Sequence, residues 1–382
     1  MSAEKILFIS HYFPPLIGGS SVLMGALVKP FPKGSIHIMR GQPHNAPIDM
    51  DFQVEHPQTI VKFPHFYKRD GNRLLPLLYL PFIYKALRIR KDFRFNAIFV
   101  CWPTHWHLEF AFRLSKILKL PLYVYMHDMW ADNRKTAIRR FLASLFEKRI
   151  LKHAKIVYTI TDEAATHFER KYDVICRKLE HSLDWNSVKN KNRILKKIEH
   201  ENFNIVHLGG IYSMMNQDSV IRINDAVQSM PKAHMWVHLQ ESDDLSELGL
   251  FGERLTKKAL KKDEVIEHLE KADIVCLPLS FDSWAKTEIN TVFPTRCLEF
   301  FICGRPILVH APKESFLAKD ARKKGWGFVI DTPNVKAISD AIEKLLSDES
   351  IQRNLVAAAW KEAHRRDSSE ISKQLQQELN VT

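Results

Sequence analysis

The residue with the clearest chemical potential is an acid inside an otherwise apolar stretch of the second half of the chain. Glu299 lies in a segment, 296–303, that we expect to be a short helix with Thr295 as its N-cap. A carboxylate among apolar neighbours is costly to bury unless something pairs with it. Glu299 could accept two hydrogen bonds from a ribose diol, and the start of the helix could hold a phosphate. The alternative is a structural salt bridge between Glu299 and Arg296 or Arg305.

Two polar groups in the first half also follow strand-like segments. His127 and Asp128 come directly after the apolar run 122–126. An imidazole beside a carboxylate there could bond a sugar hydroxyl or move a proton near neutral pH. With 18 histidines in the chain, a satisfied core histidine is the alternative for His127. Gly18 and Gly19 follow the first strand pattern and would let the backbone approach an anion closely, although they could equally form a simple turn.

An aromatic loop after another predicted strand is a candidate ligand site. Residues 102–107 include His105 and Trp106, whose rings could stack on a sugar or a lipid. The alternative is that these rings cap the hydrophobic core.

No motif predicts a metal site. Asp49-Met50-Asp51 matches a metal-binding DxD triplet, but so short a pattern in a polar loop is easily met by chance, and we reject it. The cysteines form no CxxC pair, which argues against zinc and against a disulfide framework and favours a reducing compartment. They are Cys101, Cys176, Cys276, Cys297 and Cys303.

Elements that could position these residues run the length of the chain. Apolar strand patterns bounded by helix-like segments predict parallel strands covered on both faces, and ligands of such sheets bind at the carboxyl ends of the strands. The predicted strands are 6–10, 97–101, 122–126, 156–160, 205–208, 234–239, 274–277, 307–309 and 327–330. The predicted helices are 20–29, 108–118, 136–153, 218–229, 264–271 and 335–346.

The strand series is interrupted once, by a polar segment rich in Lys and Asn. We therefore predict an α/β protein with two Rossmann-like, doubly wound domains facing a central cleft. An N-terminal domain spans 1–185, a linker 186–202 and a second domain 203–365, and a C-terminal helical segment, 366–382, returns towards the first domain.

Composition limits the class of partner. Lys and Arg number 56 against 44 Asp and Glu, a net charge of +12, which favours an anionic partner. No zinc finger, helix-turn-helix or RNA-binding signature supports nucleic acid. The apolar stretch 74–87 is too short to span a bilayer but is bordered by basic residues, so it could lie on an anionic membrane or pack on its own domain. We expect no secretory signal and a cytoplasmic protein, with the inner face of the plasma membrane as an alternative location.

Several of these segments together resemble glycosyltransferase family 4. They are 294–299, 304–308, the Phe13-Pro14-Pro15 run, the Gly18-Gly19 pair, and 127–130. The resemblance covers nearly the whole chain and implies the GT-B fold, retention of configuration at the anomeric carbon and no essential metal. By this resemblance the domain 1–185 binds the acceptor, with His105 and Trp106 as candidate acceptor ligands, and the domain 203–365 binds the donor. Glu299 would bind the donor ribose and His127 would contact the transferred sugar, while the two glycines would line the diphosphate and acceptor side.

The chain departs from the family pattern at two places. Thr291 occupies the position of the first of two motif glutamates. The segment 208–216, which contains the candidate donor residue Gly210, lacks the basic pair that binds the diphosphate in the family. Lys286 and Arg296 are the candidates to replace that charge. Thr291 and Thr295 are further candidate donor ligands.

The resemblance implies a hexosyltransferase acting in surface polysaccharide or lipopolysaccharide synthesis. It would use a nucleotide diphosphate sugar, a UDP-sugar ahead of a GDP-sugar, with no other cofactor, and a saccharide or lipid-linked saccharide acceptor. Asp128 would assist the acceptor proton. The alternatives are a nucleotide-sugar 2-epimerase and a degenerate, non-catalytic homologue that binds a sugar or a partner.

Overall fold

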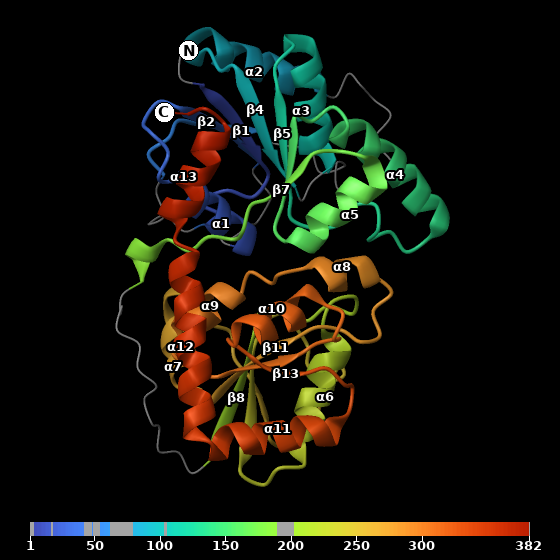
Figure 1. Ribbon diagram of the computed structural model, residues 1–382, viewed down its shortest axis with the longest axis vertical. Helices are drawn as coiled ribbons and strands as arrows, with labels where there is room; N and C mark the ends of the chain where they lie inside the picture. The colour runs from blue at the N-terminus through green and yellow to red at the C-terminus, as the bar shows by residue number, and fades with distance from the viewer. Residues whose placement is uncertain are drawn as a thin grey trace. The chain divides into compact units, whose positions relative to one another are not determined.

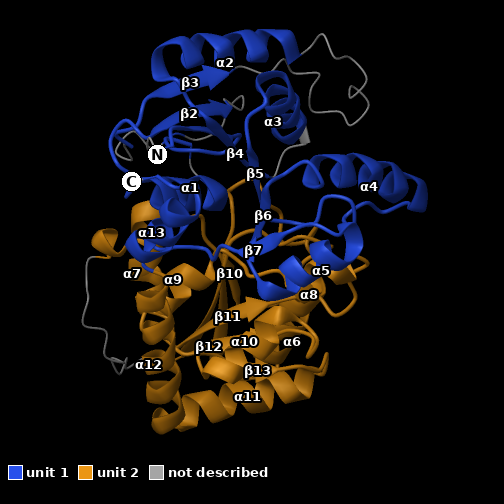
Figure 2. Ribbon diagram, turned by 45° about the horizontal axis from the view of Figure 1, so that its top comes forward, with its two compact units in different colours: residues 1–184, 367–382 blue, residues 185–366 orange. Residues whose placement is uncertain are grey.

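The computed structural model describes residues 4–16, 18–41, 48, 54–61, 79–102, 105–188 and 202–381. The chain divides into two compact units (Figure 2). Unit 1 comprises residues 1–184 and 367–382, and unit 2 comprises residues 185–366. These divisions lie next to the boundaries expected from the sequence at 185 and 366. Most of the predicted linker, residues 189–201, lies outside the described residues.

Unit 1 contains a seven-stranded parallel sheet in the order β3-β2-β1-β4-β5-β6-β7. Every residue of the apolar runs β1, β4 and β5 is buried, as expected for strands covered on both faces (Figure 1). The strands are β1 (Ile6–Ser10), β2 (Ile36–Gly41), β3 (Gln58–Val61), β4 (Ala97–Cys101), β5 (Leu122–Met126), β6 (Ile156–Thr159) and β7 (Cys176–Lys178). Only β2, β3 and β7, which carry polar residues or are short, were not predicted.

The helices of unit 1 begin and end close to the predicted positions where a prediction was made. They are α1 (Gly19–Val28), α2 (Leu80–Phe93), α3 (His105–Leu118), α4 (Ala137–Leu151), α5 (Asp162–Tyr172) and α13 (Ser368–Glu378). Thr136 and Thr161 cap α4 and α5, since each side chain accepts a hydrogen bond from a backbone N–H three residues later. Among the described residues no helix is both long and apolar enough to cross a bilayer.

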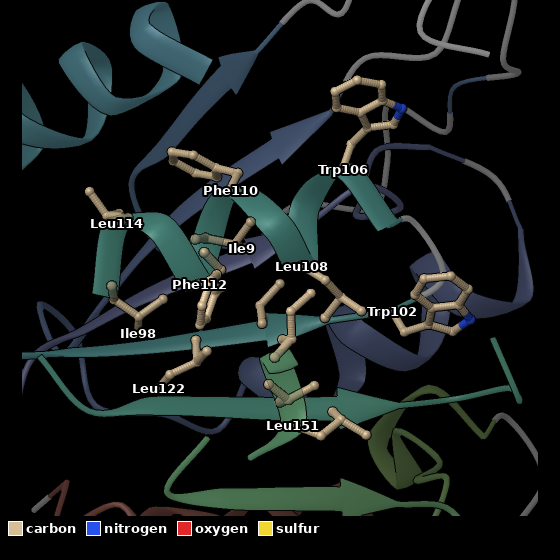
Figure 3. Close-up of a cluster of buried hydrophobic side chains, with 14 of the residues drawn as sticks. Ile9, Ile98, Trp102, Trp106, Leu108, Phe110, Phe112, Leu114, Leu122 and Leu151 are labelled. Carbon is tan, nitrogen blue, oxygen red and sulfur yellow. The ribbon is translucent and has the colours of Figure 1, made fainter. Parts of the chain in front are cut away.

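The core of unit 1 lies between the central strands and α3. Leu108 and Phe112 extend from α3 towards the strands that carry Ile98 and Leu122 (Figure 3). Trp106, in the first turn of α3, is 4% exposed and belongs to the same buried cluster.

Unit 2 repeats the architecture with a six-stranded parallel sheet in the order β10-β9-β8-β11-β12-β13. Its strands are β8 (Phe203–Leu208), β9 (Ala233–His238), β10 (Leu255–Lys257), β11 (Ile274–Pro278), β12 (Ile307–His310) and β13 (Phe328–Ile330). Its α-helices are α6 (Gln217–Gln228), α7 (Val265–Glu270), α8 (Lys286–Thr291), α9 (Cys297–Ile302), α10 (Phe316–Lys324), α11 (Val335–Ser347) and α12 (Glu349–Arg365). The predicted α/β class with two doubly wound sheets is confirmed.

The start of α9 differs from the prediction. The helix has six residues, and the N-cap position belongs to Arg296, without a side-chain cap, so the assignment of Thr295 as N-cap is wrong. The N–H of Cys297 already donates to the carbonyl of Pro294 at 3.1 Å. The chain is therefore turning from Pro294 onward, and Thr295 lies inside the turn. As predicted, the helix stops before Gly304, which adopts φ +71°.

Candidate functional site

In unit 2, a guanidinium lies against the glycine turn that ends β8. Gly209 has φ +87°, a conformation that favours glycine. Arg296 Nη2 donates to the carbonyl oxygen of Gly210 at 3.4 Å, and Nη1 lies 3.3 Å from Nε2 of His207. A Cβ on Gly209 would lie 3.5 Å from Cζ of Arg296. The start of α9 thus places a basic side chain against the segment after β8, which has no Lys or Arg of its own.

The hydrogen-bond partners of this guanidinium, the Gly210 carbonyl and the His207 ring, are neutral groups. Among the described ion pairs none involves Arg296; burial lowers its pKa, while nearby groups that include the Glu299 carboxyl oppose this shift. Its neighbour His207 is fully buried, and burial holds the pKa of that imidazole well below its usual value, so the ring is neutral at pH 7. A cation held without a carboxylate at the end of a parallel strand is suited to bind an anion.

The tautomer of His207 determines whether its Nε2 bonds the carbonyl of Gly209 or the guanidinium of Arg296. This atom lies 3.0 Å from the carbonyl oxygen of Gly209 and 3.3 Å from Nη1 of Arg296. A protonated Nε2 donates to Gly209, whereas an unprotonated Nε2 accepts from Arg296. The ring therefore holds the glycine turn in one tautomer and the guanidinium in the other.

Glu299, one turn into α9, has a buried carboxylate oxygen without a partner. Its Oε2 makes no hydrogen bond, and burial raises the pKa of the carboxyl while the charge of Arg296 opposes that rise. The alternative of a structural salt bridge is wrong, because neither Arg296 nor Arg305 pairs with Glu299; Arg305 Nε instead donates to the carbonyl of Glu270 at 2.7 Å. A buried acceptor without a donor costs free energy that a ligand hydroxyl would recover.

A pocket of about 440 Å³ lies beside the glycine turn. It is formed at the carboxyl ends of β8 and β9, where ligands of doubly wound sheets bind. Its lining residues include Gly209, Gly210, Tyr212, His238, Gln240 and Asp243. The sequence analysis selected Gly210 but missed His238 and Gln240, although both lie at the end of a predicted strand. That position was the signal that could have identified them.

The other predicted donor ligands are held by their own loops and helices. Lys286 is exposed, and its Nζ donates to the carbonyl of Phe281 at 2.7 Å. The hydroxyl of Thr291 donates to the carbonyl of Thr287 at 2.8 Å, within α8. Thr295 is half-buried in the turn before α9. Donor binding by these three residues stays a prediction.

In unit 1, His127 is buried at the end of β5. Its Nε2 lies 3.4 Å from Sγ of Cys101, and its ring packs edge-on against Tyr125 at 4.3 Å. Burial lowers the pKa of His127 to about 3, so the ring is neutral at pH 7. A neutral imidazole can donate or accept a hydrogen bond but is a weak base. Asp128, the next residue, is exposed.

Histidines that the sequence analysis did not single out gather at the same edge of this sheet. The rings of His11, after β1, and His107, in α3, lie 5.0 Å apart, and the ring of His181, after β7, lies 5.5 Å from that of His127. Burial lowers the pKa of His11 to about 4. Each of these histidines follows the carboxyl end of a strand. His181 was missed because β7 was not predicted, and His107 was missed because it lies in the first turn of α3.

The remaining sequence candidates of unit 1 are less informative. Gly18 precedes α1 with φ +151°, and Gly19 is exposed at the first position of the helix. Trp106 lies in the core, and the side chain of His105 lies outside the described part, as do Asp49 and Asp51. Acceptor binding by His105 and Trp106 stays a prediction. Within the described residues no three His, Cys, Asp or Glu side chains converge on a metal-sized site.

Comparison with known proteins links this architecture to glycosyltransferases. Residues 245–362 match the family described as Glycosyl transferases group 1. HepE (Alr3699) from Anabaena, solved in complex with UDP and glucose, has a TM-score of 0.71 at 17% identity, covering 99% of this chain and 100% of that chain. Sucrose-phosphate synthase from Thermosynechococcus elongatus has a TM-score of 0.71 at 13% identity, covering 98% of each chain. The lipopolysaccharide outer core galactosyltransferase WaaB, in its apo form, has a TM-score of 0.64 at 13% identity, covering 97% of this chain and 98% of that chain.

No curated protein sequence matches the chain significantly. The structural likeness confirms the predicted GT-B fold with its two Rossmann-like units. The resemblance to GT-B glycosyltransferases inferred from the motifs is confirmed as well, and the family match lies within unit 2. The matched segment, 245–362, contains both Arg296 and Glu299.

Proposed function

We propose that this protein is a glycosyltransferase whose unit 2 binds a nucleoside diphosphate sugar. One observation carries the proposal: Glu299, whose Oε2 is buried and unpartnered, lies one helical turn after Arg296, whose guanidinium contacts the Gly209–Gly210 turn. A ribose diol supplies donors for the carboxylate, and a diphosphate supplies negative charge for the guanidinium. A nucleoside diphosphate sugar contains both groups.

Each group has a distinct part in transfer. Glu299 would accept hydrogen bonds from the ribose hydroxyls and so fix the nucleoside. Arg296, assisted by the backbone of Gly210, would stabilise the charge that develops on the departing diphosphate. In unit 1, the neutral His127 would bond a hydroxyl of the transferred sugar, and the exposed Asp128 would take the acceptor proton.

The identities of the donor and of the acceptor are proposed from the structural neighbours. A UDP-sugar is favoured as donor because the HepE structure was solved with UDP and glucose. Transfer of a hexose to a saccharide or lipid-linked acceptor in surface polysaccharide synthesis is favoured by the likeness to WaaB. We extend the proposal to a retaining, metal-independent reaction and to a cytoplasmic location.

A second candidate function is sugar-nucleotide binding without catalysis. Thr291 replaces the first motif glutamate, and its hydroxyl already donates within α8. That group carries no charge to stabilise a developing positive charge at the anomeric carbon. A degenerate transferase would keep the Glu299–Arg296 site and lose turnover.

Calorimetric titration with UDP-glucose and other UDP- and GDP-sugars tests the donor site. We expect one donor series to bind the wild type, with binding at least about tenfold weaker in Glu299→Gln, because a charge-assisted hydrogen bond contributes about 1.5–3 kcal/mol. Glu253→Gln, an exposed acid in the same unit, is the matched control. Binding that is equal in both variants, or absent in the wild type, would refute the site. Release of UDP with a new glycosidic bond separates transfer from binding alone and from epimerisation.

A further inference from the structure

Helix α4 of unit 1 presents large apolar side chains to solvent. Ile138, Phe141, Leu142 and Leu145 are 74%, 63%, 47% and 51% exposed. Their i, i+3, i+4, i+7 spacing places them along one stripe of the helix. The opposite side of α4 is buried through Ala143, Glu147, Ile150 and Leu151. The stripe is therefore a second apolar face that the unit does not cover, and in both views α4 lies at the outside of unit 1 (Figures 1 and 2).

The charges beside this apolar stripe are all of one sign. Arg139 and Lys148, on the two sides of the stripe, are exposed, and no carboxylate among the described residues pairs with them. The nearest acids are already engaged: Glu147 is buried and accepts from the N–H of Ala131, and Glu109 pairs with Arg149. A cluster of this size on one helix differs from the single exposed apolar residues that are normal on protein surfaces.

We propose that the exposed face of α4, consisting of Ile138, Phe141, Leu142 and Leu145 with Arg139 and Lys148, docks on an anionic lipid bilayer. Apolar side chains enter the boundary between headgroups and acyl chains, while Lys and Arg remain with the anionic headgroups. Charge complementarity selects this occupant over a second copy of the chain, because two such faces would bring like charges together. The proposal is independent of the proposed glycosyl transfer, since it concerns only the surface of unit 1.

This surface differs from the one suggested by the sequence. The predicted membrane segment, 74–87, overlaps α2, where Leu80 and Tyr84 are 54% and 62% exposed. Together with Leu87, which is 37% exposed, they form an exposed stripe of three apolar residues on α2. Residues 74–78 lie outside the described part. The stripe on α4 is longer and more exposed, and it was not predicted.

Co-sedimentation with vesicles tests the proposal. The full-length protein is mixed with vesicles of phosphatidylcholine alone or of phosphatidylcholine with phosphatidylglycerol, at low and high salt. We expect binding to the anionic vesicles that weakens with salt. The double variant Phe141→Ser/Leu145→Ser should bind them roughly tenfold more weakly or worse. Arg139→Gln/Lys148→Gln should weaken binding to anionic vesicles about tenfold or more, with no effect on uncharged vesicles.

The control is Phe251→Ser, since Phe251 is 64% exposed in unit 2, almost the same as Phe141. Its vesicle binding should equal that of the wild type. Equal binding of the wild type and Phe141→Ser/Leu145→Ser would overturn the proposal, as would no binding to anionic vesicles. A wild-type dimer in sedimentation velocity that the same double variant makes monomeric would instead assign the face to a second copy. Because the substituted side chains are exposed, an unchanged melting temperature should show that the variants are folded.

Discussion

Replacing Arg296 by Met should separate diphosphate binding from protein stability. The methionine replaces the aliphatic stem of the arginine by an unbranched side chain of similar length and removes the guanidinium and its charge. The guanidinium forms no ion pair among the described residues and makes only a 3.4 Å contact with the carbonyl of Gly210 and a 3.3 Å contact with His207. Loss of these weak contacts is offset by relief of the cost of burying the charge. We expect the free energy of unfolding of Arg296→Met to lie within about 1 kcal/mol of the wild type.

Ligand binding should respond very differently. A hydrogen bond between a guanidinium and a phosphate contributes about 1.5–3 kcal/mol, so UDP should bind roughly ten- to hundredfold more weakly to Arg296→Met. Uridine, which has the same base and ribose but no phosphate, should bind the two proteins equally. Arg296→Lys should retain part of the UDP affinity, because it keeps the charge but not the planar donor geometry.

Isothermal titration calorimetry with UDP and uridine, alongside urea unfolding, measures both effects. Lys286→Met is the informative companion, since Lys286 is the other candidate cation and its Nζ donates to a backbone carbonyl in its own loop. A selective loss of UDP affinity in Lys286→Met and not in Arg296→Met would refute the assignment of the diphosphate to Arg296. Equal losses for UDP and uridine would show that Arg296 shapes the pocket instead of binding phosphate.

Three further predictions concern stability. Burial raises the folded-state pKa of Glu299 above 4.5, so the wild type should lose stability relative to Glu299→Gln as the pH rises above about 4.5. Urea unfolding midpoints of the two proteins that differ equally at pH 4 and at pH 7 would contradict this. His127, with a folded pKa of about 3 against 6.5 unfolded, should destabilise the protein by about 2 kcal/mol between pH 7 and pH 5, and His127→Phe should show a correspondingly smaller fall in stability over this range. In Gly327→Ala the new Cβ would lie 2.7 Å from Cγ2 of Val309, so thermal unfolding should show a loss of about 1–3 kcal/mol that Val309→Ala partly relieves; additive losses would exclude this clash.

The sequence determined the elements that are buried on both faces. Continuous apolar runs such as 6–10 and 274–277 can be satisfied only inside a sheet, so local composition sufficed to place β1 and β11. The sequence also identified Glu299, because an acid inside an apolar helix carries a cost that is visible without a structure. It could not find β2 or β3, whose polar residues lie towards the edge of the sheet and break the apolar pattern.

The tertiary structure alone decided which side chains meet. Arg296 and Gly209 are far apart along the chain, and only the pairing of β8 beside β11, with α9 following, brings the guanidinium onto the glycine turn. The histidines of unit 1 gather for the same reason, since parallel strands end at one edge of the sheet. The pattern of α4 was also ambiguous, because apolar spacing on a helix indicates a face that avoids water but not what covers it. Only the packing of unit 1 shows that Ile138 and Phe141 lie on the uncovered side.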